Sequence, residues 1–155
     1  MKTVFAIFFA LVITASSFAG DYIDATGAVV SQAKEYKYVV NSASAALTIG
    51  EAVCLDLTAD DGISVDYCTA IGTSLGIITD TSCAVGARCK LQTKGMFEAA
   101  VLNVSNGNAV AGSSAYFNTD GSLYGDTTPA DDITAVGVFL DSASASGTIQ
   151  VYIKP

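Results

Sequence analysis

The sequence predicts an all-β protein, a small antiparallel β-barrel or sandwich with an internal two-unit repeat, following a cleaved signal peptide. After the N-terminal leader, no long segment keeps apolar residues at the i, i+3, i+4 spacing of a helix. Instead Gly, Ser, Thr and Asp interrupt the chain about every eight to twelve residues, the spacing of short strands joined by turns. Several segments also alternate cleanly: Ile149, Val151 and Ile153 share one face of a strand near the C-terminus.

The first element is a secretory signal peptide over residues 1–19. Lys2 precedes the unbroken apolar run of residues 4–13, and Ser17 and Ala19 supply the small residues expected before a cleavage site. This run is shorter than the roughly 20 apolar residues that cross a bilayer, so we expect cleavage and no membrane insertion. Loss of Lys2 would take the formal net charge from −8 to −9. The mature chain is expected to be secreted, or held at the cell surface.

The composition excludes several kinds of chemistry. The chain contains no histidine, which rules out serine or cysteine catalysis through an imidazole base. A net charge of −8 disfavours nucleic acid as a partner, because phosphate binding depends on clustered Lys and Arg. Paired carboxylates could serve a glycosidase, but there is no tryptophan to stack on a sugar. We expect a protein without enzymatic activity and without a cofactor.

The expected strands follow in order, each bounded by turn residues. An N-terminal arm over residues 20–47 is richer in small and polar residues, with one strand or a short turn of helix around residues 31–36. A β-barrel domain over residues 48–155 carries the remaining strands. With the strand of the arm first, the expected segments are 37–41, 52–57, 64–69, 74–79, 87–93, 95–102, 114–118, 134–140 and 148–153.

Four cysteines within a short window indicate two disulfides in an oxidising compartment. Three pairings are open, and we favour Cys54–Cys68 and Cys83–Cys89 because each pair is symmetric about a turn. Asp61 lies midway in the first and Gly86 in the second. A four-thiolate zinc site is the alternative, but the spacings lack the CxxC pairs of such sites.

An internal repeat supports a two-unit architecture. Residues 76–86 and 137–147 align at a constant offset of 61, with identical Gly, Asp, Ala and Gly and with matched Ile/Val and Thr/Ser. Upstream of them stand Gly50-Glu51-Ala52-Val53 and Gly112-Ser113-Ser114-Ala115-Tyr116, respectively. Two such units, packed on each other, would make a small barrel or sandwich.

The order of these glycine-based motifs resembles the small capsid decoration proteins of tailed phages over about residues 48–155. The motifs are Gly50-Glu51-Ala52-Val53, Leu75-Gly76-Ile77, Gly86 before Lys94-Gly95-Met96-Phe97-Glu98, and in the second half 111–117, 135–138 and 147–153. The resemblance implies a compact β-barrel that assembles as a trimer and attaches to the outside of a larger protein lattice. Such proteins are assembled in the cytoplasm, whereas this chain carries an export signal.

Candidate site residues fall into two groups. The first group consists of aspartates in turns, which could supply oxygen ligands to calcium or could hydrogen-bond to their own backbone. They are Asp60, Asp61 and Asp66 in one region and Asp120, Asp126, Asp131 and Asp132 in another. Tyr36 and Tyr38 in the arm are candidates for contact with a partner subunit, since tyrosine is favoured at interfaces.

These observations predict a secreted, disulfide-stapled structural subunit that associates with itself in a coat, filament or decoration layer. Alternatives are a phage capsid decoration protein that binds the virion as a trimer, and an extracellular module that binds carbohydrate or calcium. Self-association predicts stable oligomers, whereas a binding module predicts a monomer whose melting temperature rises with its ligand.

Overall fold

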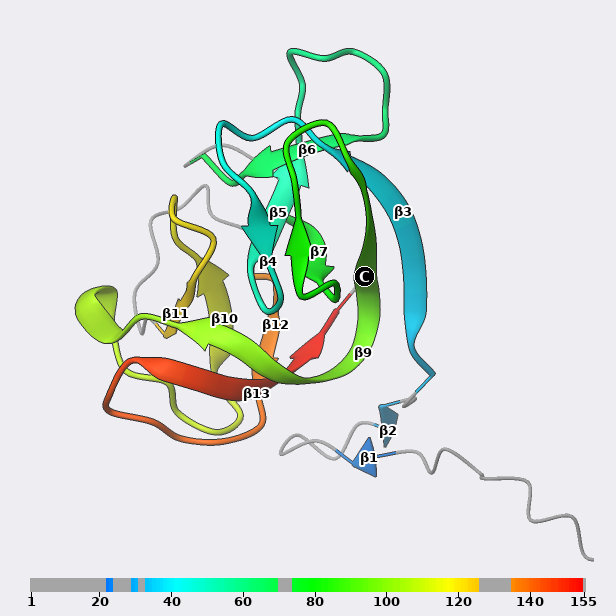
Figure 1. Cartoon of the computed structure of the whole chain (residues 1–155). Coiled ribbons are helices and arrows are strands. Elements are labelled where there is room, and N and C mark those ends of the chain that lie inside the picture. Colours follow the sequence, from blue (N-terminus) through cyan, green and yellow to red (C-terminus); the bar gives the residue numbers. More distant parts are fainter. Residues whose placement is uncertain (1–21, 24–28, 31–32, 70–73, 126–134, 155) are drawn as a thin grey trace, which may run out of the picture.

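The computed structural model describes residues 22–23, 29–30, 33–69, 74–125 and 135–154, and their regular structure is almost entirely β-strand (Figure 1). The expected all-β class is therefore confirmed. Strands β1 (Tyr22–Ile23) and β2 (Val29–Val30) pair with each other, as do β4 (Leu47–Thr48) and β8 (Ser82–Cys83). A short 3-10 helix covers Val104–Asn106. No helix in these ranges has the length and apolar character needed to span a bilayer.

Nine strands form one continuous hydrogen-bonded sheet. They are β3 (Glu35–Asn41), β5 (Ala52–Leu55), β6 (Ser64–Tyr67), β7 (Ser74–Ile78), β9 (Arg88–Leu102), β10 (Ser114–Phe117), β11 (Leu123–Gly125), β12 (Gly137–Phe139) and β13 (Gly147–Ile153). Their order is β11-β10-β12-β13-β9-β3-β6-β5-β7, with the further pairings β11–β9 and β9–β7.

Those two further pairings close the sheet on both sides of β9. We call the closed set β9-β3-β6-β5-β7 ring 1 and the closed set β9-β11-β10-β12-β13 ring 2. Ring 1 uses residues 88–94 of β9, and ring 2 uses residues 95–102. Ring 2 closes through the parallel pair Leu123↔Leu102 and the Asn103 N–H, which donates to the Leu123 carbonyl at 2.9 Å. Each half therefore closes on itself, instead of forming one face of a common barrel.

The long strand β9 joins two segments that the sequence predicts to be separate. The sequence predicts one strand over residues 87–93 and a second that begins at Gly95, but the φ of +91° at Gly95 lets the backbone bend without breaking the strand. Figure 1 shows β9 curving continuously from one ring into the other.

The strand pairings of ring 1 have counterparts in ring 2 at offsets of about sixty residues. Three matched examples are Val53↔Gly76 with Ala115↔Gly137, Ile78↔Leu91 with Phe139↔Val151, and Thr48↔Ser82 with Ala109↔Ala143. The duplication itself stays a prediction from the sequence.

Two of the matched glycines lie where the strands come closest. A Cβ at Gly76 would stand 2.2 Å from the Gln92 carbonyl oxygen, and one at Gly137 would stand 2.0 Å from the Tyr152 carbonyl oxygen. Both distances are far below van der Waals contact. The repeated glycine is therefore required by the approach of a neighbouring backbone at the same point of each ring.

Each ring has its own buried cluster. The cluster in ring 1 consists of small aliphatic and cysteine side chains, including Val53, Val65 and Leu91. The cluster in ring 2 is larger and contains three phenylalanines, Phe97, Phe117 and Phe139. Strands β5 and β7 are buried on both faces, because Ala52, Cys54 and Ile77 turn outward from ring 1 and pack against ring 2.

The expected N-terminal arm is corrected by the structure. Strand β3 lies within the sheet and pairs with β9 from Glu35↔Lys94 to Val40↔Arg88, while β4 pairs with β8. The alternative of a helical turn around residues 31–36 is also wrong at Glu35 and Tyr36, which are in β3. The exposed tyrosines and small residues resemble an arm in sequence, because only the end of β3 at Val39 and Asn41 is buried. The leader, residues 1–19, lies outside the described residues.

Candidate functional site

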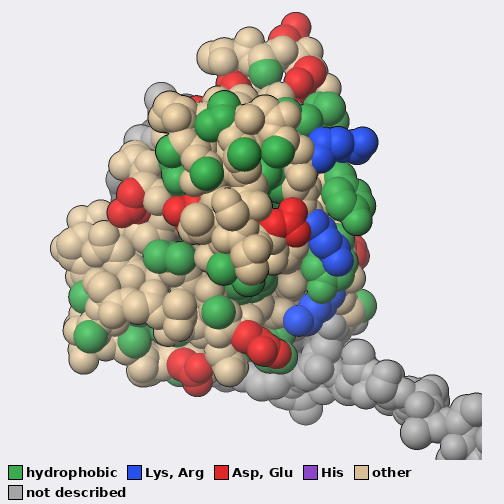
Figure 2. Space-filling view, in the orientation of Figure 1, with side chains coloured by type: hydrophobic (Ala, Val, Ile, Leu, Met, Phe, Trp, Pro, Cys, Tyr) green, Lys and Arg blue, Asp and Glu red, His purple; other side chains and the backbone are tan. Residues whose placement is uncertain are grey.

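The basic side chains are concentrated on one part of the surface. Of the six Lys and Arg residues in the described ranges, five lie on or beside β3 and the first half of β9; together with Tyr36 and Tyr38 we call them the basic strip: Lys34, Lys37, Arg88, Lys90 and Lys94. Figure 2 shows Lys and Arg side chains gathered along one side of the molecule with hydrophobic side chains between them. A protein of net charge −8 thus has a locally basic surface.

Strand alternation explains how the strip is built. Val39 and Cys89 are directly opposite each other and point into ring 1, so the pairs Tyr38↔Lys90 and Val40↔Arg88 face the other way. The Lys90 ammonium lies 4.0 Å from the centre of the Tyr36 ring, which is within cation–π distance. Tyr38 is 62% exposed. The two tyrosines, named from the sequence as interface candidates, are therefore on the surface beside cations.

Carboxylates offset only part of this positive charge. Lys94 Nζ lies 3.4 Å from Glu35 Oε1, and Asp80 Oδ2 accepts a 2.7 Å hydrogen bond from the backbone N–H of Lys90. An open groove of about 460 Å³ borders the strip and is lined by both signs of charge, with Lys34, Lys90, Asp80 and Glu98 among its residues.

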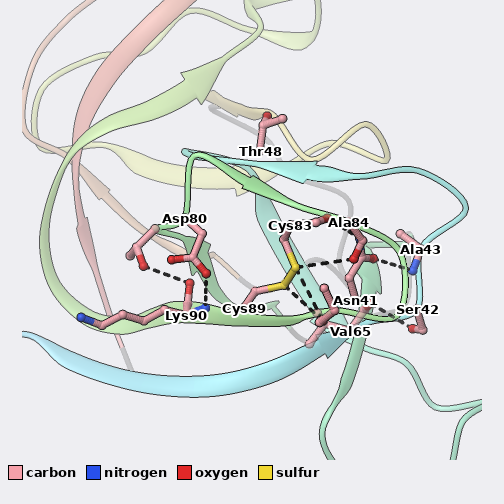
Figure 3. The surroundings of a disulfide bond; sticks show 12 residues. Asn41, Ser42, Ala43, Thr48, Val65, Asp80, Cys83, Ala84, Cys89 and Lys90 are labelled. Carbon is pink, nitrogen blue, oxygen red and sulfur yellow. Dashed lines mark hydrogen bonds between the residues drawn. A yellow bond between two sulfur atoms is a disulfide. The ribbon is translucent and has the colours of Figure 1, made fainter.

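A disulfide and a buried asparagine support the strands of the strip from their buried side (Figure 3). Cys89, between Arg88 and Lys90, is bonded to Cys83 on β8. Asn41, at the end of β3, is fully buried: its Nδ2 donates to the carbonyls of Ala45 (3.0 Å) and Cys83 (2.8 Å), and its Oδ1 accepts from the Ala43 N–H (2.8 Å). Because these polar groups are all paired, the strip rests on a support that is costly to deform.

The second disulfide joins Cys54 on β5 to Cys68, just after β6, with their Cα atoms 4.8 Å apart. The structure thus has both disulfides in the pairing that turn symmetry favours. Their sulfurs belong to the two buried clusters, one bond in each. The described residues contain no free cysteine.

The candidate calcium ligands are turn residues with backbone partners. Asp61 accepts from the Ile63 N–H (2.9 Å) and from both the N–H and Oγ of Ser64, and these hydrogen bonds, that from the Ser64 hydroxyl foremost, lower the pKa of its carboxyl. Asp66 accepts from the Tyr67 N–H at 2.6 Å. Asp60 is in the same turn, with a φ of +49°.

Asp120 has a similar role in ring 2. Burial raises the pKa of its carboxyl, but hydrogen bonds from Ser122 and Asn103 outweigh this, and the pKa is lowered. Asp126, Asp131 and Asp132 lie outside the described residues. Within the described part of the chain, no group of three or more His, Cys, Asp or Glu side chains is arranged to hold a metal ion.

The sequence predicts a turn at Asp61, but not that this turn extends into an exposed acidic loop over residues 56–63. The sequence predicts a strand that continues through Leu57, but β5 ends at Leu55 and Leu57 is 78% exposed, in the same loop as Asp60 and Asp61. The sequence signal for the earlier end of the strand is Asp56, a residue type that is common in turns. Its Oδ1 accepts hydrogen bonds from the N–H and the Oγ1 of Thr58. In Figure 1 this loop projects beyond β5 and β6.

Comparisons with known proteins agree with this architecture. No curated protein sequence matches the chain. Among solved structures, the N base of the head fiber protein gp8.5 of bacteriophage phi29 has the same fold, with a TM-score of 0.52 and 12% identity over 79% of this chain and 95% of that one. The resemblance to phage decoration proteins is confirmed, because the sequence model of the phage cement protein family matches residues 32–155. The chain therefore belongs to the phage cement protein family, a family of phage structural proteins.

Proposed function

We propose that this protein is a structural subunit that attaches to the outside of a phage capsid. The family match over residues 32–155 carries the proposal, since it covers every strand of both rings. The fold is suited to this work. Closed rings leave few unpaired strand edges, and two disulfides limit unfolding of a protein that must persist outside a cell.

The test is binding to capsids of the phage that encodes the chain, assembled without it. Purified protein should sediment with these capsids until a fixed number of sites is filled. Capsids of an unrelated phage are the matched control and should bind none. If the protein stays in the supernatant with its own capsids, the proposal is wrong.

We propose further that the chain is exported and oxidised, and that its copies associate with each other. The leader pattern before Ala19 and the two buried disulfides support export. Protein from an oxidising export pathway should begin at Gly20 in mass spectrometry and have no free thiol. An uncleaved, fully reduced yet folded chain would contradict export.

Native mass measured by light scattering tests the association. A discrete oligomer or a polymer at micromolar concentration is expected. A monomer at every concentration would contradict self-association, and a monomer whose melting temperature rises with calcium or a carbohydrate would indicate a binding module instead.

A further inference from the structure

Two exposed surfaces of the chain are complementary in charge and in apolar character. The basic strip presents cations around two tyrosines, whereas the acidic loop presents carboxylates around Leu57 and Ile63. We propose that the acidic loop of one copy docks on the basic strip of a second copy. This inference rests on the proposed self-association and names the surfaces that carry it.

The loop is shaped in advance for docking. Asp56 and Asp61 direct their carboxylates to backbone N–H groups within the loop, at 2.8 Å to Thr58 and 2.9 Å to Ile63, which fixes its path. Asp60 makes no hydrogen bond or ion pair with any residue that the structure describes, so its charge is available at the apex. A loop that is already ordered loses little conformational entropy when it binds.

Both the loop and the strip also expose large hydrophobic side chains. Leu57 and Ile63, 78% and 48% exposed, are on this loop, and Tyr36 and Tyr38 are on the strip, with Ile49 lining the groove beside it. Four of the seven exposed large hydrophobic side chains in the described residues thus belong to these two surfaces, and a fifth, Ile49, lines the groove that borders the strip. Apolar contact supplies affinity at a protein interface, while complementary charge selects the partner and its orientation.

A copy does not satisfy these surfaces internally. The ion pair in the described residues joins Lys94 to Glu35, both at the strip, and none joins a carboxylate of the loop to a cation. In Figure 1 the loop projects beyond β6, whereas β3 and β9 run down one side of the molecule. Because the two surfaces differ, the contact joins unlike surfaces: it is made twice in a two-fold dimer, or once per pair of neighbours in a head-to-tail ring or an extended chain of copies.

Two charge-altering variants test the contact. Ala59→Lys with Asp60→Asn changes the formal charge of the loop from −3 to −1 and places a cation beside position 60, where asparagine tolerates the left-handed backbone. Arg88→Glu with Lys90→Glu changes the formal charge of the five basic residues of the strip from +5 to +1, and Arg88→Glu alone is a milder version. Each variant alone should weaken association at least tenfold, measured as the concentration for half-maximal oligomer in light scattering.

An equimolar mixture of the two variants is the decisive measurement. The cation introduced at position 59 of one variant matches the carboxylates introduced at positions 88 and 90 of the other, and the unaltered strip of the first matches the unaltered loop of the second. The mixture should therefore associate more tightly than either variant alone. Lys154→Glu and Asp141→Asn alter exposed charges outside both surfaces and should associate like the parent chain.

Each failure has a separate meaning. If the parent chain assembles and the variants assemble equally well, or if the mixture does not recover, the docking inference is wrong while self-association stands. If the parent chain is a monomer, both are wrong. Circular dichroism and the melting temperature of each variant establish that the chains compared are folded.

Discussion

Ring 1 and ring 2 have matching strand pairings but are filled differently. The buried cluster inside ring 1 contains no phenylalanine and includes the Cys83–Cys89 disulfide, with the half-buried Tyr67 packed against it, whereas ring 2 buries three phenylalanines. The Cys54–Cys68 bond tethers two strands of ring 1 at the boundary with ring 2. The comparison teaches that the same five-stranded closure can be stabilised by apolar volume or by covalent links.

The largest expected effect comes from emptying the core of ring 2. Phe139→Ala should lower the free energy of unfolding by about 3 to 5 kcal/mol, because the removed ring leaves a cavity that neighbouring strands only partly fill. The matched change in ring 1 is Ile78→Ala, at the counterpart position, with an expected loss of about 2 to 5 kcal/mol.

Amide hydrogen exchange shows whether the loss of stability in Phe139→Ala is confined to ring 2 or extends to ring 1. In Phe139→Ala the amides of β10 to β13 should lose protection before those of β5 and β6, which remain tethered by the Cys54–Cys68 disulfide. Equal loss in both rings would mean that β9 couples them into one cooperative unit.

Removing a disulfide should have the next largest effect, and it should fall on ring 1. Cys54→Ala with Cys68→Ala opens a 15-residue loop and should cost about 3 kcal/mol, while Cys83→Ala with Cys89→Ala opens a shorter loop and should cost about 2 kcal/mol. Urea unfolding of the oxidised parent and both variants measures the two losses. A larger loss for the shorter loop would show that packing of the cystine, rather than loop closure, dominates.

The smallest effect concerns the turn aspartates, Asp61 in ring 1 and Asp120 in ring 2. Hydrogen bonds lower the pKa of both carboxyls below the ordinary 3.8, so their contribution to stability is present above that pH and is lost as the pH falls through the lowered value. The free energy of unfolding should therefore decrease as the pH is lowered below about 4. This decrease should be smaller in Asp61→Asn and in Asp120→Asn than in the parent chain. An unchanged pH dependence in both variants would contradict the assignment.

The strands with clear alternation could be predicted from the sequence, and others could not. Residues 148–153 were expected as a strand and nearly coincide with β13, because every second residue there is apolar. Strand β11 was missed: its three residues lie between Gly121 and a polar stretch, and they form a strand only through tertiary pairing with β10 and β9. The end of β5 was placed two residues late, because Asp56 and Leu57 continue the alternation in sequence but not in space.

The candidate site was predictable only in part. Tyr36 and Tyr38 were named from residue type, and the cystine pairs from symmetry about turns. The basic strip was not foreseen, because Lys34 and Lys37 are some fifty residues from Arg88, Lys90 and Lys94, and the register of β3 on β9 is what brings them together. Sequence spacing carries no direct sign of such a long-range antiparallel pairing.

The continuity of β9 also has a mechanical consequence. Two domains joined by a linker separate under tension at their non-covalent interface. Here a single extended backbone runs through both rings, so a pull applied across the molecule is borne by peptide bonds and by rows of hydrogen bonds loaded in shear on either side of β9. A subunit built in this way transmits a stretching force from one ring to the other without an intervening weak joint.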